Sequence, residues 1–507
     1  MIGECRIGCV FLFVTLVSAV AVQVVGAGQR SFPGECSRPW VVVNEDLNST
    51  IAVELSDAAL NRTGLREHFR KHIRAKNLTH YFVNPQAMLA GYDTKVSEPI
   101  WTEHPGLAAA PKWVAKMKKL HDDGIDPYAE WIACAREAGV SPWVSMRMND
   151  AHCLDSPKNG FATKMWLDHP EWRRVPNSRD WFECQFDYTN PEVQAHFLAW
   201  ARELLERYDM DGFECDWLRF PHHLPRGRER DFAGVLTDFM GEIRKLADEI
   251  GTRRGKRILV GARVASSVEG ARGLGTDAVE WAKAGFVDVL TVANFFHTVD
   301  FEATWADWIR LVKAANPKVK ILAGVDNGVI RRCGERSEMT VADHAGYFDN
   351  AFEAGVEDGW SLFNYFMQDS DDPIYTMLVR KDFGPKELSS MRRTYTVTYR
   401  DAVGDDMPSN GQFPVVLDRR AEIRITVGRS RPGDEVEVRV YLDPKEKTPV
   451  PLAAATLNGS KPIRIASVDR CAFPPDAVRP GVNVFSVGPK AGLKLLGCEL
   501  TLTPQSP

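Results

Sequence analysis

The chain has 507 residues, enough for roughly two or three domains, and its 44% hydrophobic and 26% charged residues are typical of an ordinary globular protein. Its formal net charge of −5 is small for this length. A dedicated nucleic-acid binder usually carries a basic stripe, so the composition argues against nucleic acid as a partner.

The first residues predict a cleavable export signal. Arg6 precedes an apolar run from Cys9 to Val25, and small residues follow that suit cleavage after Ala27. An uncleaved membrane anchor is the alternative, but the run is shorter than a spanning helix and contains Gln23. We therefore expect a secreted or periplasmic protein with no membrane partner after cleavage.

Export would permit disulfides between the cysteines that follow the signal. Cys471 and Cys498 share the C-terminal segment and are the pair that we expect there, while Cys153 and Cys184 flank one long loop and form a second candidate. No C-x-x-C pairing occurs, which argues against zinc-finger and thioredoxin-type sites.

Short apolar segments then alternate with helical patterns. We predict helices near residues 57–76, 113–121, 127–138, 194–207, 232–249, 276–284, 303–314 and 340–354. We predict strands at 40–44, 79–84, 141–149, 212–216, 258–263, 287–292, 319–325 and 359–364. This alternation indicates a parallel sheet, and eight units suit an α/β fold of the closed (β/α)8 TIM-barrel type. A doubly wound open sheet is the alternative, but no G-x-G-x-x-G motif leaves a strand to support it.

The pattern changes near Met391. The segments 394–399, 421–426 and 435–441 alternate polar and apolar residues, which predicts half-buried strands and a small all-β sandwich. The expected boundaries are 1–27 for the signal peptide, 28–39 for a linker, 40–390 for the barrel and 391–507 for the sandwich.

The clearest functional pattern lies in the stretch from Tyr208 to Pro221. Strand side chains alternate between faces, so Glu214 and Asp216 point the same way at the C-terminal end of the fourth strand. In a parallel αβ barrel, active sites form at that end. Ordinary surface acids are the alternative, but the aromatic loop that follows, with Trp217 and Phe220, favours a binding wall.

Polar residues occupy most of the other strand exits. The outer face of each barrel strand must be apolar, so Val144 and Met146 are expected outside and Arg147 inside. Trp143 is also expected outside, in core packing. The candidate substrate-binding residues at this mouth are Asn84, Arg147, Asn149, His152, Trp217, Arg219, Arg263, Asn294 and Asn364.

Cleavage of a glycosidic bond typically needs two carboxyl groups, one that protonates the leaving oxygen and one that acts as nucleophile or base. Asp216 is the first choice for the nucleophile or base, and Glu214 and Asp326 compete for the partner role. The spacing leaves the retaining and inverting geometries open.

Three segments carry a family resemblance: Met146-Arg-Met-Asn-Asp150, Asp211-Gly-Phe-Glu-Cys-Asp-Trp-Leu-Arg-Phe-Pro221 and Asn364-Tyr365. They resemble the secreted TIM-barrel group called "family 10 glycosyl hydrolase-like", over roughly residues 40–369. The resemblance implies a glycoside hydrolase with Asp216 at the fourth-strand acid position. The seventh strand ends in Asp326, where the resemblance leads us to expect Glu.

Two other functions stay open at this point. One is a non-catalytic carbohydrate-binding barrel, and the other is a metal-dependent hydrolase on the same fold, although no H-x-H leaves the first strand. We expect no cofactor and no metal. The substrate is expected to be a carbohydrate, either neutral or anionic, because Arg147, Arg219 and Arg263 either pair with the acids or bind sulfate or uronate groups. The oligomeric state is left open.

Overall fold

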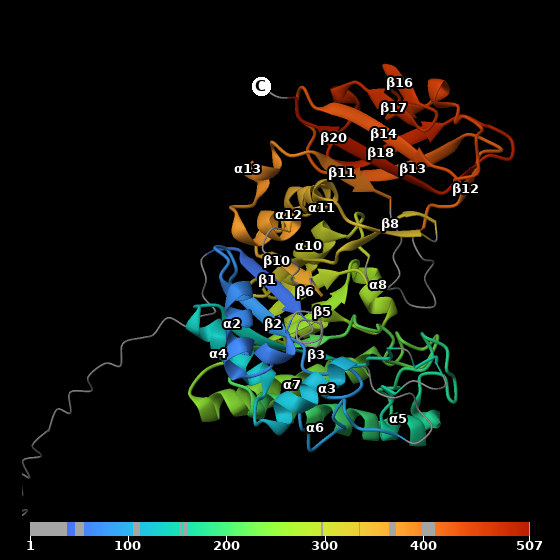
Figure 1. Cartoon of the computed structure of the whole chain (residues 1–507). Coiled ribbons are helices and arrows are strands. Elements are labelled where there is room, and N and C mark those ends of the chain that lie inside the picture. The colour runs from blue at the N-terminus through green and yellow to red at the C-terminus, as the bar shows by residue number, and fades with distance from the viewer. Residues whose placement is uncertain are drawn as a thin grey trace, which may run out of the picture.

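The computed structural model describes residues 38–45, 55–104, 112–152, 154–156, 160–295, 298–333, 335–364, 372–397 and 411–505 (Figure 1). The predicted signal peptide lies outside these ranges, as do most of the predicted linker, Cys153 and Tyr365. No helix among the described residues is both long and apolar enough to span a membrane.

Eight parallel strands close into a barrel in the order β1-β10-β7-β6-β5-β4-β3-β2. They are β1 (Trp40–Glu45), β2 (His80–Val83), β3 (Ser141–Arg147), β4 (Gly212–Asp216), β5 (Leu259–Ala265), β6 (Val289–Ala293), β7 (Lys320–Val325) and β10 (Gly359–Phe363). Each one lies within a residue or two of its predicted position. The predicted TIM barrel is therefore confirmed, and the open doubly wound sheet is excluded.

Helices separate the strands and cover the outside of the barrel (Figure 1). The longer ones are α2 (Arg62–Ile73), α3 (Lys112–Asp122), α4 (Pro127–Glu137), α6 (Pro191–Arg207), α7 (Ala233–Arg254), α10 (Trp305–Ala315) and α11 (Val341–Glu353). Shorter helical pieces are η1 (Asp57–Ala59), α5 (Lys164–Asp168), η2 (Pro170–Trp172), α8 (Val268–Gly273), α9 (Ala278–Lys283), α12 (Pro373–Tyr375), η3 (Thr376–Arg380) and α13 (Pro385–Leu388).

The sequence fixes the helix starts through local capping. Asn190 accepts a hydrogen bond from the N–H of Glu192 at the start of α6, and Pro191 takes the first helical position, where a missing N–H costs nothing. Thr340 and Asp343 form a reciprocal capping box at the start of α11.

An apolar plug fills the lower part of the barrel. It consists of Trp40, Val42, Phe82, Trp143, Val289 and Leu322, all buried. Trp143 stacks on Phe82 with ring centroids 4.7 Å apart, and it fits only because Gly212 has no side chain: a Cβ there would lie 2.2 Å from the indole. The expectation that Trp143 faces outward was wrong. Trp143 shares the inner face with Ser145, and an apolar residue on a barrel strand can line the floor as well as the outer wall.

Separate antiparallel sheets follow the barrel, as the alternating pattern predicted (Figure 1). The largest has the order β11-β20-β14-β17-β16, beside a three-stranded sheet β13-β18-β15 and a pair β12-β19. Their bounds are β11 (Arg393–Thr396), β12 (Val415–Val416), β13 (Ala421–Val427), β14 (Glu435–Tyr441), β15 (Thr456–Leu457), β16 (Arg464–Ser467), β17 (Arg470–Phe473), β18 (Gly481–Val487), β19 (Lys494–Leu495) and β20 (Gly497–Thr503), with short turns η4 (Leu452–Ala454) and η5 (Pro475–Ala477). A hairpin of β8 (Gly328–Arg332) and β9 (Glu335–Glu338) extends from the barrel.

Buried charges join these sheets to the barrel helix α11, and we call this set the junction. Arg393 at the start of β11 is fully buried and pairs with Asp349 of α11 at 3.1 Å and with Asp434 at 2.7 Å. Tyr395 also donates to Asp349, at 2.5 Å. A Cβ at Gly346 would lie 2.2 Å from the main-chain oxygen of Thr394, so helix and strand are packed backbone to backbone.

The predicted disulfide between Cys471 and Cys498 is not formed. Both are free thiols, and they lie on β17 and β20, which are separated by β14. Two strand spacings amount to about 9.5 Å, beyond the reach of a disulfide. Cys184 is also a free, buried thiol, and its candidate partner Cys153 lies outside the described residues.

Candidate active site

Glu214 and Asp216 lie on the inner face at the end of β4, where the alternation placed them. Three donors from three other strands surround Glu214: Ser145 Oγ at 2.7 Å, Thr291 Oγ1 at 3.1 Å and Asn44 Nδ2 at 3.4 Å. Burial, reinforced by the charge of Asp216, raises the pKa of Glu214 to about 7. Glu214 is therefore able to hold a proton near neutral pH.

Asp216 has a different environment, although it is also buried. Its Oδ1 accepts hydrogen bonds from the main-chain N–H groups of Leu218 at 3.1 Å and Arg219 at 2.9 Å, and from the guanidinium of Arg263 at 3.1 Å. Arg263 in turn lies 3.6 Å from the ring centre of Phe363. Every one of these contacts favours the ionised carboxylate.

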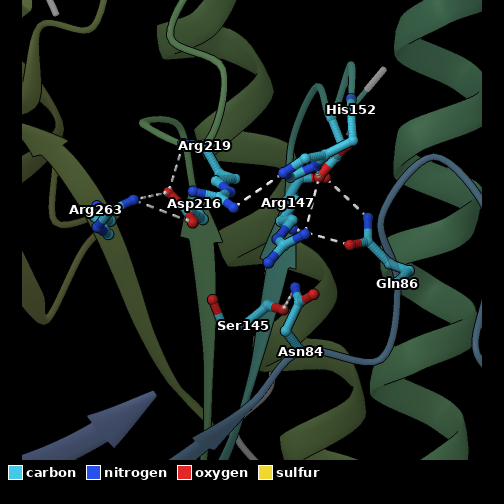
Figure 2. A network of polar contacts seen from close by, with 9 residues as sticks. Asn84, Gln86, Ser145, Arg147, His152, Asp216, Arg219 and Arg263 are labelled. Atoms are coloured by element: carbon cyan, nitrogen blue, oxygen red, sulfur yellow. Dashed lines mark hydrogen bonds and ion pairs between the residues drawn. The ribbon is translucent and has the colours of Figure 1, made fainter. Parts of the chain in front are cut away.

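A third carboxylate, Asp150, binds Arg147 and His152, both of which Figure 2 shows in the polar network. It accepts from Arg147 Nη1 at 3.0 Å and from His152 Nδ1 at 2.7 Å. Burial alone would raise its pKa, but the charges of His152, Arg147 and Arg219 outweigh it, and the pKa of Asp150 falls below its usual range. The sequence pattern marked the neighbours of Asp150 and missed its role, which depends on contacts across the turn after β3.

Arg219 connects the two sets of acids. Its main-chain N–H binds Asp216, and its Nη2 lies 3.0 Å from His152 Nε2. Figure 2 shows the guanidinium of Arg219 between Asp216 and His152, with Arg263 on the other side of Asp216. The predicted residues Arg147, His152, Arg219 and Arg263 are thus brought together around two carboxylates.

Amide side chains hold the end of β3 in place. Asn84 donates to the main-chain oxygen of Ser145 at 2.7 Å, and Gln86 exchanges two hydrogen bonds with the main chain of Arg147, at 2.8 and 3.1 Å. Asn149 donates to two main-chain oxygens and accepts from Phe186 N–H. Asn149 was expected to bind substrate, but its amide holds together the loops after β3 and β4.

Trp217 does not line the mouth, contrary to the prediction. Its ring is 1% exposed and packs edge-on against Tyr188, Phe239 and His223, and its indole N–H points to Met240 Sδ at 3.2 Å. Trp217 therefore faces the covering helix α7. Side chains alternate along β4, so Trp217 points outward like Phe213 and Cys215.

Other aromatic residues line the mouth instead. His152 packs edge-on against Phe220, with ring centres 4.9 Å apart, and against Trp181, at 6.4 Å, and those two rings are 5.0 Å from each other. Phe220 also packs against Phe295 and holds a left-handed φ of 61°. Among the tryptophans of the long loop, Trp166 is buried beneath Arg173 and only Trp181 lies beside His152.

The remaining predicted residues lie at other strand exits. Asn294 follows β6, and its main-chain oxygen accepts from Arg263 at 3.2 Å while its side chain donates to Thr298. Asn364 follows β10 in a left-handed conformation with φ of 47° and is buried. Asp326 follows β7, three strands from β4 in the barrel order, and its Oδ1 accepts from Asn327 N–H at 2.7 Å.

Within the described part of the chain, no group of three or more His, Cys, Asp or Glu side chains is placed to hold a metal ion. His222 and His223 follow the β4 loop, and burial lowers the pKa of both. His223 Nε2 contacts the main-chain oxygen of Trp217 at 2.8 Å.

Comparison with known proteins gives distant likenesses only. No family model matches the chain. The 1,4-alpha-glucan branching enzyme GlgB 2 of Xanthomonas campestris pv. campestris is 34% identical over 95 residues, which are 18% of this chain. The chain spans 12% of that relative's length.

Solved structures with a related shape include carbohydrate-active enzymes of two kinds. A cycloisomaltooligosaccharide glucanotransferase from Paenibacillus sp. is 10% identical with a TM-score of 0.35, and the match covers 91% of this chain and 57% of that one. The GH36 alpha-galactosidase AgaA from Geobacillus stearothermophilus is 11% identical with a TM-score of 0.34, covering 92% and 56%. At this level of similarity, the matches do not assign the chain to a family.

Proposed function

We propose that this protein is a glycoside hydrolase that cleaves O-glycosidic bonds in a poly- or oligosaccharide at the mouth of the barrel. The observation that carries the proposal is the carboxyl pair of β4. Two acids on one face have opposed environments, one with a pKa raised to about 7 and one held by a guanidinium and two main-chain N–H groups. Glycosidic cleavage needs this combination of a protonated and an ionised carboxyl group.

In this proposal Asp216 is the nucleophile or base, because all of its contacts favour the charged form. Glu214 is the proton-holding partner beneath it, and Asp326 remains the alternative acid from across the barrel. Polar residues at the strand exits either contact the bound sugar or position the side chains that contact it. They are Asn84, Arg147, His152, Arg219, Arg263, Asn294 and Asn364. Phe220, which was predicted for the apolar wall together with Trp217, keeps that role, and Trp181 takes the place of Trp217.

The proposal includes export by the predicted signal peptide and a catalytic barrel at residues 40–390, followed by a sandwich at 391–507. The substrate is a carbohydrate that is either neutral or anionic. Arg147 and Arg263 each pair with a carboxylate of the protein, which favours the simpler role of keeping the acids ionised.

A screen of the purified protein against neutral, uronic and sulfated polysaccharides tests the function. We expect reducing ends to appear with one class of polymer, and we expect Asp216→Asn to lower kcat by about 10³-fold or more while circular dichroism stays unchanged. Full activity in the folded variant would refute the role of Asp216. Binding without turnover by the unmodified protein would favour a carbohydrate-binding barrel instead.

A further inference from the structure

His152 and Asp150 form a carboxylate–imidazole pair beside the β4 acids. The two oxygens of Asp150 lie 2.7 and 2.9 Å from His152 Nδ1, and one of them also accepts the main-chain N–H of His152 at 2.9 Å. Because both oxygens face Nδ1, that nitrogen carries a proton and donates it to the carboxylate. The other nitrogen, Nε2, is then unprotonated and accepts from Arg219 Nη2 at 3.0 Å.

The two members of the pair differ sharply in exposure. The Asp150 side chain is 0% exposed, whereas that of His152 is 29% exposed. Arg147 holds the far side of the carboxylate at 3.0 Å, so Asp150 is a fixed negative charge behind the ring. A buried anion that orients an exposed imidazole is the arrangement by which proteins stabilise an imidazolium during proton transfer.

Contacts on both nitrogens hold the ring in one orientation, with Nδ1 at Asp150 and Nε2 at the guanidinium of Arg219. Arg219 Nη2 lies 3.0 Å from Nε2, and the main-chain N–H of Arg219 binds Asp216 (Figure 2). Phe220 and Trp181 meet the imidazole edge-on from the sides. Among the described contacts, the charged groups around the pair include Arg147 at the end of β3, which binds Asp150, and Arg219 in the loop after β4, which contacts Nε2.

Glu214 is poorly placed to reach a leaving oxygen. Both acids of β4 are buried, but Glu214 lies two residues deeper on the strand than Asp216, and donors from β1, β3 and β6 surround its carboxyl group. His152 is the better exposed of the two proton-carrying groups near Asp216.

We propose that His152 is the acid–base residue of this site and that Asp150 is its positioning residue. The inference rests on the proposed function, with Asp216 as nucleophile, and it transfers to His152 the proton-donating role that the proposed function gives to Glu214. In the first step Asp216 bonds to the anomeric carbon, the bond to the leaving oxygen breaks, and that oxygen takes the Nε2 proton of the imidazolium. In the second step a water oxygen displaces Asp216 from the carbon, and Nε2 takes the proton of the water.

In this scheme Arg219 leaves Nε2 when substrate binds, and Nε2 takes up a proton from solvent before the first step, because a protonated Nε2 cannot accept the hydrogen bond of Arg219. Asp150 then balances the charge of the imidazolium, and Arg219 is released towards the substrate. Glu214 in this scheme sets the electrostatics beneath Asp216 and need not touch the leaving group.

The test compares two substrates in His152→Asn and Asp150→Asn: the natural oligosaccharide found in the polysaccharide screen, and the 2,4-dinitrophenyl glycoside of its sugar. The dinitrophenolate leaves without protonation. We therefore expect kcat/KM of His152→Asn to fall by about 10²–10⁴-fold on the oligosaccharide and by less than about tenfold on the dinitrophenyl glycoside. Asp150→Asn should fall less on the oligosaccharide and shift the pH profile, because the ring is still present but no longer oriented.

His169→Asn is the matched control. His169 also has an acid two residues away, Glu171 at 3.0 Å, but this pair is exposed on the long loop, and the variant should keep full activity on both substrates. Equal losses on the two substrates, or no loss, in a folded His152→Asn would overturn the inference while Asp216→Asn still reports on the proposed function. Should the asparagine variant not fold, His152→Gln takes its place in the same assay. An inactive unmodified protein would refute the function and this inference together.

Discussion

The mouth of the barrel and the junction both bury arginine–aspartate pairs, but they use them differently. At the junction, Asp349 on α11 accepts from Arg393 and Tyr395 on β11 and from the main-chain N–H of Arg429, which follows β13. Its partners come from one side, and every contact ties one part of the chain to another. The junction is therefore explained by its role in holding the sheets against the barrel.

At the mouth, the buried charges lie at successive depths in the barrel, and contacts connect them to the partly exposed side chain of His152. Glu214 lies beneath Asp216 on one strand, and the network ends in His152, which is 29% exposed. The comparison teaches that a buried ion pair alone does not indicate a catalytic site. The proposed active site rests instead on a carboxyl group with a raised pKa and on contacts that lead from the buried charges to the partly exposed His152.

The largest effect is expected at the junction. Asp349→Ala leaves Arg393 and Tyr395 buried without their shared acceptor, although Asp434 still pairs with Arg393 at 2.7 Å. Removal of one partner from a buried ion pair costs about 3–5 kcal/mol, and because of Asp434 we expect a loss near the lower end of that range. The free energy of unfolding from urea titration should fall by that amount. The protein that remains folded should keep nearly all of its activity, which would show that the junction supports the fold and not the site at the mouth. A decrease in the free energy of unfolding of less than about 1 kcal/mol would contradict the role given to Asp349.

A smaller, pH-dependent effect is expected from Glu214. Because burial raises its pKa to about 7 from an ordinary value near 4.5, the folded protein binds this proton more tightly than the unfolded chain. The resulting stabilisation is fully present below pH 4.5 and is lost as the pH rises through 7, a change of at most about 3 kcal/mol. Glu214→Gln removes this dependence, so its stability relative to the unmodified protein should rise between pH 4.5 and pH 8. If the free energies of unfolding of the two proteins changed in parallel with pH, the raised pKa of Glu214 would be contradicted.

Local rules predicted the fold and the main acid pair. Apolar runs gave all eight strands, and strand alternation placed Glu214, Asp216 and Arg263 inside the barrel, because burial on both faces leaves little freedom for a parallel strand. The same rule was misapplied to Trp143, since apolar character does not distinguish the barrel floor from the outer wall. Trp217 was assigned to the mouth from its place in an aromatic loop, although its parity already placed it outward.

What the sequence could not supply are contacts between segments far apart in the chain. The pairing of Arg263 with Asp216 joins β5 to β4, and the contact of Arg219 with His152 joins two loops 67 positions apart. The failed pairing of Cys471 with Cys498 has the same origin, because the strand order that inserts β14 between them is a property of the folded sheet.

The smallest effect is expected at the exposed edge of the junction. Glu353 lies one helical turn after Asp349 on α11 and pairs with Arg429 at 3.3 Å, but the two side chains are 30% and 64% exposed. Glu353→Ala removes the same kind of charge from the same helix, facing the same sheets. Because solvent screens this pair, we expect a loss of less than about 1 kcal/mol, which should shrink further in high salt. Comparing Asp349→Ala with Glu353→Ala thus measures the effect of burial on stability, because the two residues have the same charge and lie one turn apart on one helix. Equal decreases in the free energy of unfolding, measured by urea titration, would show that burial does not account for the stabilisation by the junction.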